Sequence, residues 1–422
     1  MSLDALIIGG GPGGSTAAAV LAGAGRRVVV LEKERFPRFH IGESLLPYNR
    51  PLFVELGLWP TLRAADFPRK TGAQFLLANG TKARRFIFRN GRFTRESETI
   101  QVERARFDEL LLRHAQGRGA DVREGWTANR VSTRPDRIEV EATDPAGRPH
   151  HFEATFVLDA SGRANLTGNQ HGQRVVHPRH RKLAVFGHFD AVWRDPGEAG
   201  GDTVIVRFAD RWVWLIPVSA SRTSVGLVLD KDDFMAEGGD ATTVFWAAVC
   251  RSPVLRARMD GARLAGTLQV TSDFSYFNRR LVGPRLLRVG DAAGFMDPIF
   301  SAGVYLAMWS GQLAARAVLG ALAAGTDGRR PLAAYERRLR RAMRVYWRLV
   351  EHYYTKSFME LFLEPRHGLD LPAAVLAVLA GDFEPAWPVR WRLELFYLLV
   401  RLQRFHALVP RLDFARSAPA AA

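Results

Sequence analysis

The chain has 422 residues, of which 47% are hydrophobic and 24% are charged. This composition is ordinary for a globular protein of two or three domains. A single cysteine, Cys250, excludes a disulfide framework and a metal site built from cysteines. We expect Cys250 to be a small buried side chain and not a reactive thiol.

Lysine and arginine outnumber aspartate and glutamate by 59 to 43, so the formal net charge is +16. The excess fits an acidic partner, but a compositional bias toward arginine explains it equally well. The basic segment 337–344 has helical spacing and few aromatics, which favours a solvated helix face over nucleic-acid binding. Without a basic leader or an apolar run of about 20 residues, the sequence predicts a soluble, cytoplasmic protein with no membrane span.

The first predicted elements form a βαβ unit. An apolar strand at 5–9, a helix of small residues at 13–25 and a second apolar strand at 26–34 follow one another directly. Helices are then predicted at 46–56 and 106–116, with a short strand at 120–125.

The later elements interrupt and then resume this unit. Alternating residues predict antiparallel strands at 137–142, a strand and glycine turn at 155–163, and a second antiparallel sheet within 182–230. A return strand is predicted at 286–294, followed by helices beyond Ala302 and a disordered tail at 416–422. The order predicts an α/β fold in which a Rossmann-like domain is interleaved with a mixed, largely antiparallel sheet and followed by C-terminal helices.

A glycine loop, GGGPGG, connects the first strand to the first helix. In this position glycines let backbone N–H groups and the helix N-terminus approach a pyrophosphate. The predicted dinucleotide-binding residues of this unit, including an acidic residue for the ribose hydroxyls at the end of the second strand, are Gly9, Gly11, Gly13, Gly14, Glu32 and Lys33.

Two later segments return to the same nucleotide and favour FAD over NAD. They are LDASGR, with Asp159 and Gly162, and RVGDAAG, with Asp291 and Gly294. Asp291 stands between a strand and a helix, where a carboxylate can bind ribityl hydroxyls. Arg104, in the segment 101–112, is a further candidate near the phosphates or the ring.

At this point the chain resembles the superfamily of FAD-dependent aromatic hydroxylases and geranylgeranyl reductases. Two complete motifs then make it similar to the flavin-dependent halogenases. The first is W-x-W-x-I-P, as Trp212, Trp214, Ile216 and Pro217, and the second is F-x-x-P-x-x-S-x-G, as Phe295, Pro298, Ser301 and Gly303. The segment IGESLLP at 41–47, which contains Ser44, looks like the mobile flavin-covering loop of the same family.

On this superfamily plan the chain divides into alternating segments. The predicted FAD-binding domain comprises residues 1–70, 101–180 and 281–325, and the substrate domain comprises 71–100 and 181–280. A C-terminal helical region is predicted at 326–415.

The two tryptophans of the first motif alternate along a strand, so their side chains project to one face. The resemblance implies a wall beside the flavin that keeps the organic substrate away from the oxidant. Core packing of two large aromatics is the alternative interpretation.

The resemblance also implies the chemistry. Reduced FAD and O2 give a C4a-hydroperoxide, chloride or bromide is oxidised there, and hypochlorous acid diffuses to a lysine beside an electron-rich ring. The matching residue is Lys70, whose ammonium can polarise the oxidant. Lys33 and Lys182 stay open as alternatives, as does a surface role for Lys70.

The second motif supplies the halide site. Backbone N–H groups at Ala302 and Gly303 can bind an anion, with Ser301 as a candidate catalytic residue. Tryptophan halogenases usually have a glutamate where this chain has Phe300. The departure favours the phenol- and pyrrole-type branch, whose substrates are often tethered to an acidic carrier protein.

No metal site is predicted, and His177 and His180 are expected in a surface turn. Tyr353, Tyr354 and Phe358 are expected to line the substrate pocket, because the family's C-terminal helices cover that side.

The overall expectation is a two-component halogenase of specialised metabolism, such as antibiotic biosynthesis, served by a separate flavin reductase. A flavin monooxygenase or reductase, and a non-catalytic partner of a carrier protein, are the alternatives.

Overall fold

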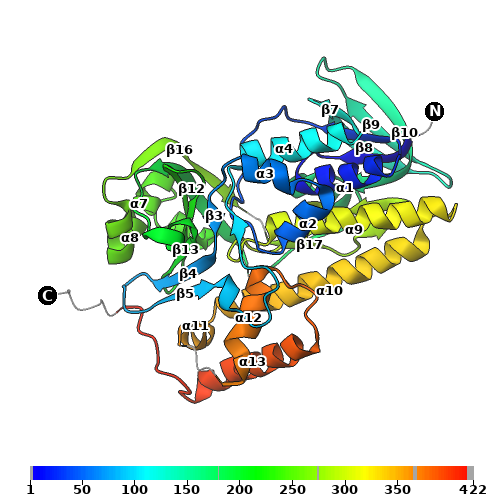
Figure 1. Cartoon of the computed structure of the whole chain (residues 1–422). Coiled ribbons are helices and arrows are strands. Elements are labelled where there is room, and N and C mark those ends of the chain that lie inside the picture. Colours follow the sequence, from blue (N-terminus) through cyan, green and yellow to red (C-terminus); the bar gives the residue numbers. More distant parts are fainter. Residues whose placement is uncertain (1–2, 179, 273–274, 365–367, 416–422) are drawn as a thin grey trace.

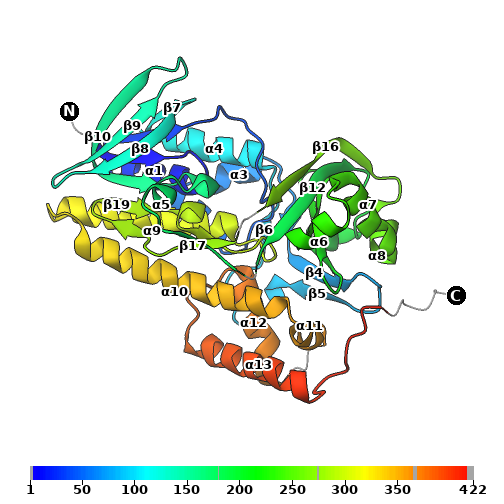
Figure 2. The ribbon, with the colours of Figure 1, turned by 180° about the vertical axis from the view of Figure 1, so that it is seen from behind.

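A computed structural model describes residues 3–178, 180–272, 275–364 and 368–415. In Figure 1 a first layer, which contains the N-terminal strand and helix, lies beside a second sheet, and a group of helices from the end of the chain lies below both. Figure 2 shows from behind that the long helices α9 (Gly303–Ala323) and α10 (Arg329–Tyr353) run together under the first layer. The predicted tail at 416–422 lies outside the described residues.

The first sheet has a parallel centre. Its strand order is β18-β19-β10-β1-β2-β7, with β1 hydrogen-bonded in parallel to both β10 and β2. The central strands are apolar because helices and a β-meander cover both faces. The strands are β1 (Leu3–Ile8), β2 (Val28–Glu32), β7 (Asp121–Glu124), β8 (Thr127–Thr133), β9 (Ile138–Thr143), β10 (Pro149–Asp159), β18 (Val282–Gly283) and β19 (Leu286–Arg288).

Helix α1 (Pro12–Gly23) packs against α9 on one face of this sheet. Small residues permit the contact, since a Cβ on Gly311 would lie 2.3 Å from the carbonyl oxygen of Gly13. By length and composition α9 is apolar enough to cross a membrane, but half of that stretch is buried inside the protein. A core helix satisfies the same criteria, and α9 is placed as one.

The second sheet has the strand order β16-β12-β15-β14-β13-β4-β5 and is antiparallel except where β13 pairs with β4. One face of this sheet packs into the core that it shares with the first layer. The other face packs against α7 and α8. The strands are β4 (Gly72–Leu77), β5 (Ala83–Ile87), β12 (Lys182–Asp190), β13 (Thr203–Arg207), β14 (Trp212–Pro217), β15 (Arg222–Asp230) and β16 (Arg263–Ser272).

The remaining helices and strands lie outside the two sheets. The helices are α2 (Asn49–Leu56), α3 (Trp59–Ala64), α4 (Arg104–Gly117), α5 (Leu166–Gln170), α6 (Lys231–Ala236), α7 (Ala241–Arg251), α8 (Pro253–Met259), α11 (Lys356–Leu363), α12 (Leu371–Ala380) and α13 (Trp387–Phe405). The remaining strands are β3 (Arg69–Lys70), β6 (Thr99–Ile100), β11 (Arg174–Val176), β17 (Tyr276–Asn278) and β20 (Gly294–Phe295).

The mixed α/β architecture with C-terminal helices agrees with the expected fold class. Two local predictions were wrong. Cys250 is exposed and not buried, because it lies on the outer side of α7. Helix α2 begins at Asn49 and not at residue 46, because the Asn49 side chain accepts a hydrogen bond from the Leu46 amide at the helix entry, 3.0 Å away. The limits of the domains stay a prediction.

Candidate active site

The glycine loop lies between β1 and α1 beside a cavity of about 470 Å³. Two glycines are required by packing. Gly9 has φ +100°, and a Cβ on Gly14 would lie 1.9 Å from the Gly9 carbonyl oxygen. Gly11 differs, because the atom nearest to a Cβ there would be an Arg38 nitrogen, 3.7 Å away. The N-terminus of α1 therefore meets open space where a diphosphate can approach.

Glu32 ends β2 at the same cavity. Its buried carboxylate accepts hydrogen bonds from the Gly10 amide at 2.6 Å and the Glu34 amide at 2.8 Å. Each oxygen therefore accepts one backbone bond and keeps a further acceptor site for a ribose hydroxyl. Lys33 also lines the cavity and is exposed.

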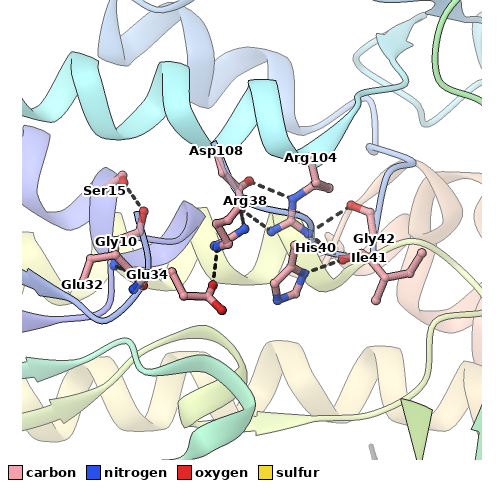
Figure 3. A network of polar contacts seen from close by, with 10 residues as sticks. All are labelled: Gly10, Ser15, Glu32, Glu34, Arg38, His40, Ile41, Gly42, Arg104 and Asp108. Atoms are coloured by element: carbon pink, nitrogen blue, oxygen red, sulfur yellow. Dashed lines mark hydrogen bonds and ion pairs between the residues drawn. The ribbon is translucent and has the colours of Figure 1, made fainter. Parts of the chain in front are cut away.

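Arg104 lies at the start of α4, and its guanidinium is occupied by protein groups (Figure 3). It forms a bidentate pair with Asp108 and donates to the carbonyl oxygens of Ile41 and Gly42 at 2.8 and 3.2 Å. Although burial opposes the shift, Arg104 holds the pKa of Asp108 below its usual range. Arg104 therefore fixes the 41–47 loop in position.

Arg38 completes this network and was not predicted from the sequence. It pairs with Asp108 at 2.8 Å and with Glu34 at 3.0 Å, and it lines the cavity. Its neighbour His40 is half-buried there, and desolvation lowers the pKa of His40 to about 4. The motif signal for Arg38 is weak, because an arginine six residues after the end of the second strand has no fixed spacing in the pattern.

Glu43, in the 41–47 loop, was also missed. One of its carboxylate oxygens lies 2.5 Å from His188 Nε2, while the other is buried without a hydrogen-bond partner. Glu43 lines the large cavity. A buried acceptor at the cavity wall can take a hydrogen bond from a ligand, and FAD carries N–H and O–H groups that can donate one. This acceptor, the open helix N-terminus and the ribose-side carboxylate together fit FAD.

The predicted cofactor residues separate into two sets. Those that line the large cavity are Gly9, Gly11, Gly13, Glu32, Lys33, Ser44, Arg104, Gly162 and Asp291. Burial raises the pKa of Asp291 to about 6. Gly14, Asp159 and Gly294 are not among the lining residues. The Asp159 carboxylate instead accepts bonds from Ser161 and Thr167 and holds the turn after β10.

Trp212 and Trp214 project to one face of β14, as predicted. Both line the large cavity together with Ile216, while the alternate residues Val213 and Leu215 belong to the core on the other face. Their ring centroids are 5.8 Å apart. Pro217 pairs at the strand end and does not line the cavity. The two indoles form both a wall of the cavity and part of the core.

Buried polar groups hold Trp212 from behind. Its indole N–H donates to the Tyr354 hydroxyl at 3.0 Å, and that hydroxyl donates to Asp297 at 2.8 Å. Asp297 belongs to the loop of the second motif, and burial raises its pKa to about 6. This chain of bonds connects the tryptophan wall, the end of α10 and the loop before α9.

Lys70 lies in β3 and is buried, with 2% of its surface exposed, so a surface role is excluded. Its ammonium donates to Ser44 Oγ at 2.7 Å and to the Leu45 carbonyl at 3.0 Å. Burial, opposed by Asp202, lowers the pKa of Lys70 to about 7. Lys182 differs, because it forms an ion pair with Asp230 at 2.9 Å and lines neither cavity.

A second cavity of about 20 Å³ lies beside Lys70. This volume holds about one water molecule. Aromatic and aliphatic side chains surround it: Leu46, Phe75, Phe86, Phe88, Phe300, Leu376 and Leu379. Leu376 and Leu379 come from α12, whose apolar segment gave no sign of this role in the sequence.

The two cavities share part of their walls, namely Thr203, Ile205, Ile299 and Ser301. Ser301 has φ +60°, a left-handed conformation that is uncommon for residues other than glycine. The large cavity is lined by Phe295, Pro298 and Gly303, and Ala302, the N-cap residue of α9, is buried. The second motif therefore lies between the two spaces.

Two other expectations were wrong. Tyr353, Tyr354 and Phe358 line neither cavity, because they pack one layer farther out, with Tyr353 against Phe300. His180 is half-buried in a group of rings with His177, Trp347 and Tyr354, so it is not a surface residue. Among the described residues, no group of three or more His, Cys, Asp or Glu is placed to hold a metal ion.

Comparisons with known proteins agree with this geometry. A family model described as Tryptophan halogenase matches residues 4–104 and 79–361. A 1H-pyrrole-2-carbonyl peptidyl-carrier-protein chlorinase of Pseudomonas fluorescens is 32% identical over 404 residues, covering 90% of this chain and 89% of that protein. A tryptophan 2-halogenase of Chondromyces crocatus is 34% identical, covering 77% of this chain and 63% of that protein.

Solved structures lead to the same group of proteins. The structure of the flavin-dependent brominase Bmp2 superimposes with a TM-score of 0.86 at 28% sequence identity. The match covers 96% of this chain and all of that chain.

Proposed function

Because the chain belongs to the flavin-dependent halogenase family, we propose that it chlorinates an electron-rich pyrrolic or phenolic ring that is delivered by a carrier protein. The observation that carries the proposal is the position of Lys70. It is a buried lysine without an ion pair among the described residues, it borders an aromatic cavity, and this cavity shares four lining residues with the large one.

FAD would be held by the lining residues of the large cavity. The α1 N-terminus at Gly11 would hold the diphosphate, Glu32 the ribose, and Asp291 with Glu43 the ribityl and ring groups. When bound in reduced form, FAD with O2 supplies the oxidising equivalents that convert chloride to hypochlorous acid. A separate flavin reductase would supply the reduced cofactor, since the sequence has one dinucleotide-binding glycine loop.

The halide would bind where the second motif enters α9. At the N-terminus of this 21-residue helix, the backbone N–H groups of Ala302 and Gly303 would bind the anion. Gly303 lines the large cavity, and Ser301 lines both cavities. Halide oxidation would therefore take place next to the shared wall.

The tryptophan wall would keep the ring of the substrate out of the large cavity. Trp212 and Trp214 are fixed by hydrogen bonds to Tyr354 and Ser224, so the barrier is rigid. Hypochlorous acid, which is much smaller than the organic ring, would cross where the two spaces share Thr203 and Ser301.

Lys70 would hold the oxidant for transfer. Its ammonium donates a hydrogen bond to the hypochlorous oxygen, which makes the chlorine more electrophilic. The ring carbon forms a bond to chlorine, the ring C–H proton is lost, and hydroxide leaves as water. Ser44 would position the ammonium through its 2.7 Å bond.

A tryptophan-type substrate is the second candidate, and the 34% identity to a tryptophan 2-halogenase supports it. Phe300 weighs against it, because tryptophan halogenases usually place a glutamate there. A Phe300 side chain cannot accept the proton that an indole loses. A pyrrole or phenol needs less assistance.

The test combines purified protein, FAD, a flavin reductase, NADH, O2 and chloride or bromide. Pyrroles, phenols and tryptophan are offered free, and pyrrole-2-carbonyl is also offered on a carrier protein. Mass spectrometry should show a halogen isotope pattern that follows the halide supplied. Oxygen insertion without halogen would contradict the proposal and favour a monooxygenase. FAD and carrier binding without turnover would favour a non-catalytic partner.

A further inference from the structure

The outer face of α13 is apolar, although it faces solvent. Trp387, Leu398 and Phe405 are 73%, 49% and 79% exposed. With Trp391 and Leu402 they recur at spacings of four, seven, four and three residues, which places all five on one side of the helix. We name these five residues the apolar stripe.

The opposite face of α13 is apolar as well. Val389, Leu393, Phe396 and Val400 are buried against the rest of the C-terminal helices. A surface helix normally carries one apolar face and one polar face. The apolar stripe extends over the 19 residues from Trp387 to Phe405, which corresponds to about 27 Å of helix axis. Single exposed apolar side chains are ordinary, but a continuous row marks a contact surface.

Arginines follow one flank of the apolar stripe. Arg390, Arg401 and Arg404 are exposed, and in the described part of the chain none of them forms an ion pair. The acidic residue among them, Glu394, is already paired with Arg348. A partner for this surface therefore needs apolar side chains next to acidic ones.

The surface lies outside the Lys70 cavity. Helix α13 packs on α12, and α12 contributes Leu376 and Leu379 to the wall of that cavity. Figures 1 and 2 both show α13 at the lower edge of the molecule, with α12 between it and the sheets. A macromolecule bound to α13 would thus be one helix away from the lysine.

We infer that the apolar stripe and its arginine flank dock the acidic carrier protein that presents the substrate ring on the Lys70 side of the protein. This inference rests on the proposed function. A second copy of the chain fits less well, because a symmetric contact would bring the arginine flanks of two chains of charge +16 together. The carrier satisfies the apolar face and the charge at once.

The probe is a peptidyl carrier protein that bears pyrrole-2-carbonyl on its phosphopantetheine arm. Two variants remove separate features: Arg390→Glu with Arg401→Glu, and Leu398→Ser with Phe405→Ser. The matched control is Arg337→Glu with Arg341→Glu, two exposed arginines of α10 that form no ion pair among the described residues. All substituted side chains are exposed, so folding should persist.

Calorimetric titration should show at least tenfold weaker carrier binding for both stripe variants and an unchanged dissociation constant for the control. Added salt should weaken wild-type binding more than that of the charge-reversed variant. FAD-dependent O2 consumption should match wild type in all three. Equal carrier affinity in wild type and the stripe variants would overturn the inference, as would the absence of carrier binding by the wild type.

Two further measurements test other occupants of the stripe. Loss of dimerisation in the stripe variants with unchanged carrier binding would assign the surface to a second copy. Loss of binding to anionic phospholipid vesicles with unchanged carrier binding would assign it to a membrane. Both results overturn the inference. Stripe-dependent carrier binding without any halogenated product would instead contradict the proposed function and leave the docking surface in place.

Discussion

The two cavities share four wall residues but differ in size and chemistry. The large one, about 470 Å³, is lined by a glycine loop, carboxylates and arginines, whereas the small one, about 20 Å³, is lined by aromatic and aliphatic carbon with one ammonium. A polar dinucleotide needs the polar lining of the large cavity. A closed site limits side reactions of an oxidant, and an ammonium acts more strongly at low dielectric. Under the proposed function, the oxidant would be made beside the large cavity and used beside the small one.

The largest expected effect concerns the glycine loop at the large cavity. Gly14→Ala places a Cβ 1.9 Å from the Gly9 carbonyl oxygen, so we expect a loss of about 3 kcal/mol or more of stability and no FAD binding. Gly11→Ala is the control, because its Cβ faces the cavity. It should keep the wild-type melting temperature while binding FAD more weakly. Wild-type melting of Gly14→Ala in calorimetry would contradict the packing argument.

The next prediction concerns the pH dependence of halogenation and Lys70 at the small cavity. The pKa of Lys70 is lowered to about 7, and the proposed transfer needs the protonated amine. Product formation should therefore fall about tenfold per pH unit well above pH 7, while FAD reoxidation keeps its rate. Stopped-flow measurements with product quantification separate the two rates. A halogenation rate that stays constant from pH 6 to 9 would contradict the role of the ammonium.

The lowered pKa of Lys70 also predicts how the stability of the protein depends on pH. Between pH 7 and 10.5 the folded chain holds Lys70 neutral while the unfolded chain holds it protonated. Stability should therefore rise with pH through this window, by at most about 1.4 kcal/mol per unit. Urea titrations of wild type and Lys70→Met at several pH values should show that only the wild type has this component.

A smaller effect is expected from Ser44→Ala. The substitution removes the hydroxyl 2.7 Å from the Lys70 ammonium and leaves only the Leu45 carbonyl as its acceptor. Halogenation should fall about tenfold, as expected when a positioned donor is misaligned. Ser44→Thr, which restores a hydroxyl, should recover part of the rate. Equal rates in Ser44→Ala and wild type would show that Ser44 does not position the lysine.

The smallest effect is expected behind the tryptophan wall. Tyr354→Phe removes the acceptor of the Trp212 indole and the donor to Asp297. We expect a loss of about 1 to 2 kcal/mol in the free energy of unfolding. Because the wall loosens, a few per cent of oxygenated product should appear in mass spectra. Unchanged stability would contradict the structural role of this chain of bonds.

Local sequence signals were sufficient to predict several residues that line the large cavity. The glycine loop, Glu32 and the alternating tryptophans each have a fixed spacing that determines a backbone shape or a strand face. Lys70 was predicted only through the family resemblance, since a single lysine has no periodicity. Tyr353 and Phe358 were expected at the pocket, but Leu376 and Leu379 occupy that place. Which helix covers a site depends on long-range packing between C-terminal elements, and an apolar segment does not specify it.

The most direct test follows both compartments in Lys70→Met. The reaction contains reduced FAD, O2 and chloride, with an amine trap for oxidised chloride and a pyrrole-2-carbonyl carrier as substrate. Lys182→Met is the control, a buried lysine that lines neither cavity. We predict that Lys70→Met still forms trapped oxidised chloride but loses at least a hundredfold in chlorinated pyrrole, while Lys182→Met retains both. Chlorinated pyrrole at the wild-type rate in Lys70→Met would contradict the separation of the two chemistries, and so would loss of the trapped oxidant.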